Sequence, residues 1–86
     1  MIQDAISLRE TIRVEILKQT SRNRELAQKI DDMICQFRLP TFGLKDALRK
    51  TYKISDAQAE ELITLLDLYF DVKEMIDDLR KKQYLI

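Results

Sequence analysis

Apolar residues recur three or four positions apart through most of the 86-residue chain, and this spacing predicts amphipathic helices. The most regular stretch lies at about 55–83, where neither Gly nor Pro interrupts the pattern and a helix of about 40 Å is expected. Ser55 and Gln58 have the spacing of a capping box at its start. Its apolar positions form a narrow seam of the coiled-coil kind, namely Leu62, Leu65, Tyr69, Val72, Ile76 and Leu79.

Two shorter apolar stripes precede the long helix. The first runs from Ile2 to about Gln19 and contains Ala5, Leu8, Ile12 and Ile16. The second contains Leu26, Ile30, Met33 and Phe37. Polar residues occupy every face at 19–24, which predicts either a turn, with Ser21 or Asn23 as the cap of a new helix, or a polar waist in one continuous helix. We favour a break at this point.

The only Pro and the only Gly of the chain, Pro40 and Gly43, mark a loop. The second stripe should therefore end near Arg38, and a short helix is expected at about Leu44–Tyr52. These patterns together predict an all-α fold. The expected architecture is a small antiparallel bundle of three to four helices around a long C-terminal helix, with residues 1–86 forming a single domain.

Charge is balanced overall but divided unevenly along the chain. Lys plus Arg and Asp plus Glu number 15 each, which argues against a generally basic nucleic-acid binder. Residues 1–53 carry 11 basic and 7 acidic side chains, a net charge of +4, whereas residues 54–86 carry 4 and 8, a net charge of −4. Antiparallel packing would place these opposite charges face to face. We interpret the division first as complementarity within the chain and second as partner recognition.

The sequence offers little catalytic chemistry. It has no histidine, which removes the commonest general base and metal ligand. A single glycine excludes a glycine-rich phosphate loop. The adjacent pairs Asp31-Asp32 and Asp77-Asp78 diverge by about 100° on a helix, so neither forms a carboxylate dyad. We expect no enzyme activity and no catalytic, cofactor-binding or metal-ligating residues.

The lone cysteine and the absence of an export signal bear on location. Cys35 has no partner for an intrachain disulfide, which suits the reducing cytoplasm, and we expect it to be exposed or in a subunit contact. No apolar run approaches the roughly 20 residues of a membrane span. The start of the chain lacks the basic and apolar regions of a secretory signal. The apolar end at 84–86 is expected to be either frayed or docked on the body.

A locally basic region is the second functional signal. Its candidate phosphate contacts are Arg9, Arg13, Arg22 and Arg24. Glutamates are interleaved with these arginines, so a solvated mixed face is the simpler interpretation. No aromatic side chain is interleaved to stack on bases.

The apolar seam of the long helix is the most informative functional signal. Its first half can be explained as the core of a monomeric bundle. Its second half has only the N-terminal helix as a partner within the chain, and a bend near Ser21 would leave it uncovered. A second copy would then cover it. The interface residues expected on this basis are Tyr69, Val72, Ile76 and Leu79, together with Phe42 from the loop.

The order of motifs in residues 26–70 resembles a known helical arm. Ile30-Asp31-Asp32-Met33-Ile34, a short helix ending in Leu48-Arg49-Lys50-Thr51-Tyr52, and Ile54-Ser55-Asp56-Ala57-Gln58 follow one another. This order is similar to the coiled-coil tip of bacterial DNA gyrase A and topoisomerase IV A subunits, whose helical knob is the dimer contact called the exit gate. The loop at 39–43 has no counterpart there, and nothing resembles the DNA-cleaving region. The resemblance implies only a helical hairpin that dimerises through its tip.

The expected function is therefore a cytoplasmic, non-enzymatic protein–protein interaction or dimerisation module. It would be a small regulatory or adaptor protein that needs no cofactor, binds another protein and forms a homodimer. The alternative is a small DNA- or RNA-associated regulator that uses the basic N-terminal helices.

Overall fold

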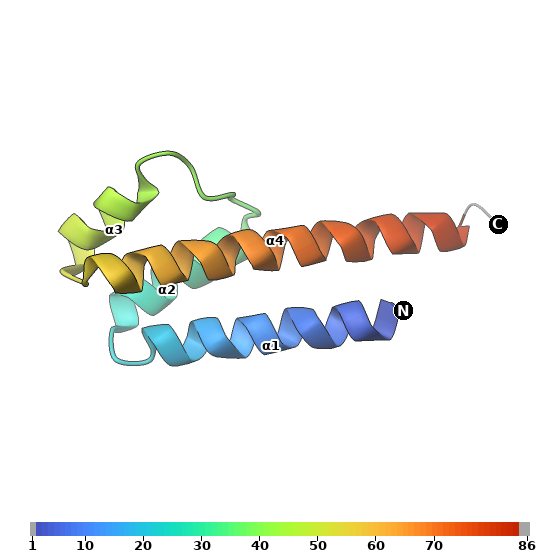
Figure 1. Cartoon of the computed structure of the whole chain (residues 1–86), viewed down its shortest axis with the longest axis horizontal. Helices are drawn as coiled ribbons and strands as arrows, with labels where there is room; N and C mark the ends of the chain where they lie inside the picture. Colours follow the sequence, from blue (N-terminus) through green and yellow to red (C-terminus); the bar gives the residue numbers. More distant parts are fainter. Residues whose placement is uncertain (1, 85–86) are drawn as a thin grey trace.

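The computed structural model describes residues 2–84 as four helices, α1 (Ile2–Thr20), α2 (Arg24–Cys35), α3 (Leu44–Tyr52) and α4 (Asp56–Tyr84). α1 and α4 lie side by side and antiparallel, α2 lies behind them, and α3 packs against the first half of α4 (Figure 1). The molecule extends 49 × 23 × 19 Å along its principal axes. The expected all-α bundle around a long C-terminal helix is confirmed. Residues 85 and 86 of the apolar tail lie outside the described part of the chain.

The break between the first two stripes is real. α1 ends at Thr20, and Asn23 caps α2 because its Oδ1 accepts a hydrogen bond of 3.1 Å from the amide of Leu26. The other candidate cap, Ser21, instead donates its hydroxyl to the carbonyl oxygen of Lys18 at 3.0 Å. Residues 2–35 therefore form two helices joined by a tight turn.

Two glutamines fix α1 against the start of α4. Ser55 caps α4, since its Oγ accepts a hydrogen bond of 3.1 Å from the amide of Gln58. The Gln58 side chain does not complete the expected capping box but donates to the carbonyl oxygen of Gln19 at 3.1 Å. The Gln19 side chain in turn donates to Oε1 of Glu61 at 3.1 Å. These contacts link the last turn of α1 to the first turns of α4 and thereby fix their antiparallel register.

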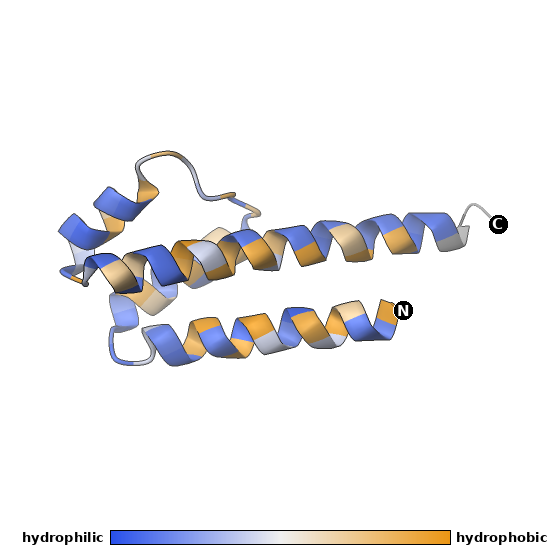
Figure 2. Ribbon diagram, in the orientation of Figure 1, coloured by the Kyte–Doolittle hydropathy of each residue, from blue (hydrophilic) through white to orange (hydrophobic). Residues whose placement is uncertain are grey.

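One hydrophobic core joins all four helices. Its best-buried members include Leu26 of α2, Leu48 of α3, and Leu62, Leu66 and Ile76 of α4. Figure 2 shows the apolar residues of α1 and α4 along the sides where the two helices approach each other. Burial of each such side chain contributes about 1.5–3 kcal/mol, so this core is the main source of stability. None of the helices described between residues 2 and 84 is long and apolar enough to cross a lipid bilayer.

The second half of the α4 seam is covered within the chain. Tyr69, Val72 and Ile76 retain only 7%, 4% and 0% of their surface, and they share one cluster with Ala5 and Ile12 of α1. Leu79 is partly buried against the same cluster. The expectation that these four residues offer an open face to a partner is therefore corrected. The chain does turn near Ser21, but α1 runs back along α4 and covers the seam (Figure 1).

Three residues expected to face the interior lie at the surface instead. Leu8 is 48% exposed, which places it at the edge of the α1 stripe, and Ala47 of α3 is also exposed. Phe37 is 60% exposed. Phe37 follows the end of α2, so its helical spacing from Met33 does not carry it into the core.

Candidate interaction surface

Residues 36–43, which join α2 to α3, form the α2–α3 loop. Its first turn is a Schellman motif: the amide of Arg38 donates to the carbonyl oxygen of Met33 at 3.0 Å, and that of Phe37 donates to Ile34 at 3.4 Å. Phe37 has the left-handed backbone that this motif requires, with φ of 55°. The motif ends α2 about one turn before the expected boundary near Arg38.

Phe37 occupies a position where glycine is usual. A left-handed backbone costs a residue with a Cβ roughly 1–2 kcal/mol. The side chain recovers little of this by burial, because it is 60% exposed. Its aromatic face lies under Nζ of Lys73, which is 2.8 Å from the ring centroid. The chain therefore keeps a strained, half-open aromatic side chain beside α4.

Phe42 stands at the corner of a tight turn. The amide of Leu44 donates to the carbonyl oxygen of Thr41 at 3.1 Å, and Gly43 has φ of 89° and ψ of −6°, the third position of a type II turn. The Gly43 carbonyl oxygen accepts the first helical hydrogen bond of α3 from Ala47 at 3.1 Å. Phe42 is thereby directed away from the body and is 109% exposed relative to a free residue.

A hollow of about 450 Å³ lies beside the loop. It combines an apolar lining from Met33, Leu39 and Leu44 with the cationic side chains of Lys29 and Arg38, and no acidic residue lines it. Leu39 itself is 63% exposed. We define the loop surface as the three exposed apolar residues of the loop and these two cations, namely Phe37, Leu39, Phe42, Lys29 and Arg38.

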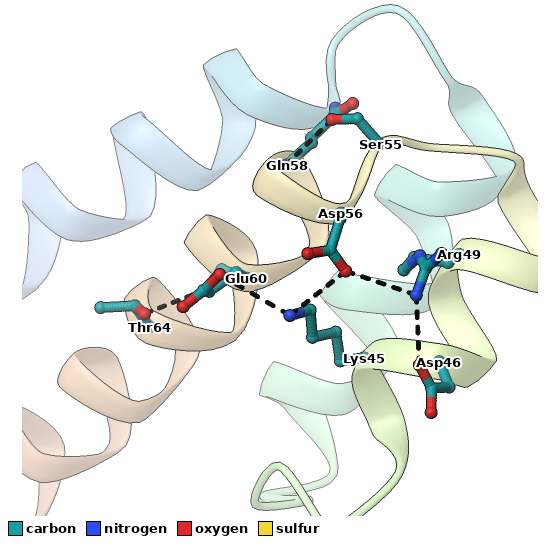
Figure 3. Close-up of polar contacts among 8 residues, drawn as sticks. All are labelled: Lys45, Asp46, Arg49, Ser55, Asp56, Gln58, Glu60 and Thr64. Atoms are coloured by element: carbon teal, nitrogen blue, oxygen red, sulfur yellow. Dashed lines mark hydrogen bonds and ion pairs between the residues drawn. The ribbon is translucent and has the colours of Figure 1, made fainter.

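Ion pairs hold α3, and with it one end of the loop, against α4. Nζ of Lys45 lies 3.2 Å from Oδ1 of Asp56 and 3.6 Å from Oε2 of Glu60 (Figure 3). Nη1 of Arg49 lies 3.3 Å from the same Asp56 oxygen. Hydrogen bonding to Asp56 raises the pKa of Lys45 above its usual value. The network is exposed, so it orients α3 more than it stabilises the fold.

The five residues expected at an interface are distributed very unequally. Phe42 is fully exposed, Leu79 is partly buried, and the other three lie inside the core. The sequence missed Phe37, because a place in a stripe and a place after a helix end have the same spacing. It also missed Leu39, although its position before Pro40 in a loop was a usable signal.

The four arginines expected at a phosphate site do not converge. Arg9 and Arg22 are about 20 Å apart along the chain direction of α1. Arg9 already lies 3.8 Å from Oε1 of Glu10. Arg13 and Arg24 line different hollows, and each of these hollows also contains an acidic residue. Their arrangement is that of a mixed solvated surface.

Comparison with protein-family models, with curated proteins and with solved structures finds no match to this chain. The resemblance of residues 26–70 to the gyrase and topoisomerase IV arm stays a prediction.

Proposed function

We propose that the chain is a non-enzymatic protein–protein interaction module, a small regulatory or adaptor protein that binds through the loop surface. The observation that carries this proposal is the exposure of three large apolar side chains within six residues of one loop. Scattered exposed apolar residues are ordinary on a protein surface, but a contiguous group marks a place where a partner binds.

The fixed geometry of the loop supports the same conclusion. Backbone hydrogen bonds hold both ends of the loop, so Phe37 and Phe42 are presented without a large loss of conformational freedom on binding. Burying each phenylalanine in a complex would contribute about 1.5–3 kcal/mol, which exceeds the backbone strain at Phe37. Aromatic anchors of this kind commonly dominate the binding energy of an interface.

A nucleic-acid regulator is the weaker proposal. Its four arginines are dispersed, and Arg9 already pairs with Glu10. The loop surface, in contrast, combines aromatic and aliphatic side chains with only two cations. Such a composition favours a protein surface over a phosphate backbone.

The cytoplasm is the compartment that suits this module. Its single cysteine, Cys35, is exposed at the end of α2. An exposed thiol without a disulfide partner is compatible with a reducing compartment.

Site-specific photo-crosslinking in the source cell tests the proposal. A benzophenone amino acid replaces Phe42 in one version of the protein and Val14 in the other, because Val14 is also exposed and apolar but lies on α1. Position 42 should give a discrete crosslinked product and position 14 should not. Equal products from both positions, or none from position 42, would refute the loop as the binding surface.

A further inference from the structure

The exposed side of α4 carries alternating apolar and acidic residues. Leu68, Asp71, Met75 and Asp78 follow one another at intervals of three, four and three residues, which places them on one face of the helix. Leu68 and Met75 are each 46% exposed, and both aspartates are exposed. We call these four residues the acidic strip. Neither aspartate forms an ion pair within the part of the chain that the structure describes.

The acidic strip and the loop surface are complementary in both charge and polarity. The loop surface has three exposed apolar side chains and the cations Lys29 and Arg38, and within residues 2–84 neither cation forms an ion pair. The strip has two half-exposed apolar side chains and two unpaired carboxylates. Complementary potentials of this kind set the register of an interface and exclude wrong partners.

We infer that the partner of the loop surface is a second copy of this chain, which presents its acidic strip. The inference rests on the proposed function and names its partner. In each copy Phe37 touches Lys73 of α4, and Phe42 shares a hollow with Ile63 and Thr64. The loop therefore runs along α4 next to the strip. Because both surfaces adjoin on one side of the molecule, a two-fold axis brings each loop onto the partner's strip and closes the dimer.

The surface area of the chain is consistent with this pairing. Its accessible surface is 6367 Å². A compact monomer of its mass exposes about 5,300 Å² on average, so the excess is about 1,000 Å². A standard interface buries about 800 Å² on each partner, which this excess accommodates.

Sedimentation of the full chain from low to high micromolar concentration tests the inference. The wild type should form a concentration-dependent dimer of twice 10.2 kDa. Phe42→Ser, Arg38→Glu and Asp71→Arg should each weaken the dimer by about tenfold or more, because each removes a contact of a desolvated interface. Val14→Ser, an exposed apolar residue outside both surfaces, should leave the dimer unchanged.

The combined variant Arg38→Glu/Asp71→Arg is the decisive one. If the two residues meet across the interface, exchanging their charges restores much of the lost affinity, and a merely structural defect would add rather than cancel. A wild type that stays monomeric, or a dimer indifferent to both charge changes, overturns the inference. The outcome for the proposed function is separate: a position-42 crosslink to a protein of a different mass would keep the loop as the binding surface and replace the second copy by another partner.

Discussion

The packing of α1 over the second half of the α4 seam makes a quantitative prediction for Ile76→Ala. Ile76 has no exposed surface and belongs to the cluster that joins α4 to α1. Removing its three outer carbons loses their transfer free energy and leaves a cavity. The cost for an isoleucine in such a site is about 2–5 kcal/mol, and we take about 3 kcal/mol because α1 ends near this region and can relax towards the gap.

This loss is large for a chain of this size. Domains of 60–100 residues lose roughly 4–8 °C of melting temperature for each kcal/mol, so Ile76→Ala should lower Tm by roughly 15–20 °C. Thermal and urea unfolding followed by circular dichroism at low micromolar concentration would measure both quantities. An unchanged m value would show that the variant unfolds through the same change in exposed surface.

The matched control is Val14→Ala, which shortens a branched side chain that is 49% exposed on α1. It should change the free energy of unfolding by less than about 0.5 kcal/mol. If Ile76→Ala melted within a few degrees of the wild type, α1 would not cover the seam. The seam would then return as an open surface, and the assignment of binding to the loop would lose its main support.

Three further changes test other parts of the structure. Ser55→Ala removes the cap of α4 and should cost about 1 kcal/mol in urea unfolding, whereas a value near zero would mean that the Gln58 amide finds another acceptor. Phe37→Gly relieves the left-handed strain and should raise the free energy of unfolding by roughly 0.5–1 kcal/mol while weakening partner binding, so a destabilised variant would show that Phe37 serves the fold. Because the pKa of Lys45 is raised in the folded state, its pairing with Asp56 contributes stability below the unfolded pKa of 10.5, and this contribution is lost as the pH rises through the folded pKa. The difference in stability between wild type and Lys45→Met should therefore be constant from neutral pH to about pH 9 and shrink above pH 10.5; a difference that instead disappears near neutrality would assign it to another group.

Much of the fold could be read from local signals in the sequence. Ser55 marks the start of α4, Asn23 was one of two candidate caps for α2, and the loop containing Pro40 and Gly43 separates α2 from α3. Each of these signals acts through a backbone hydrogen bond or a backbone dihedral angle, so it needs no knowledge of distant residues.

The candidate site was harder to predict because it depends on how the helices meet. Whether Val72 is covered depends on the direction α1 takes after the turn at 21–23, which local spacing does not determine. Phe37 continued an apolar stripe in the sequence, but a left-handed residue at the helix end turned it out of the core. The pairing of Lys45 with Asp56 joins two helices whose relative orientation no single-helix pattern encodes.

The central claim, that binding occurs through the α2–α3 loop, is tested most directly by an NMR dilution series. Backbone amide shifts of the isotope-labelled full chain are recorded from high to low micromolar concentration. The account predicts concentration-dependent shifts at residues 37–43 and on the 68–78 face of α4, with the amides of α1 around Val14 unchanged. Shifts that cluster on α1 instead, or spectra that are identical at every concentration and stay so when cell extract is added, would contradict it.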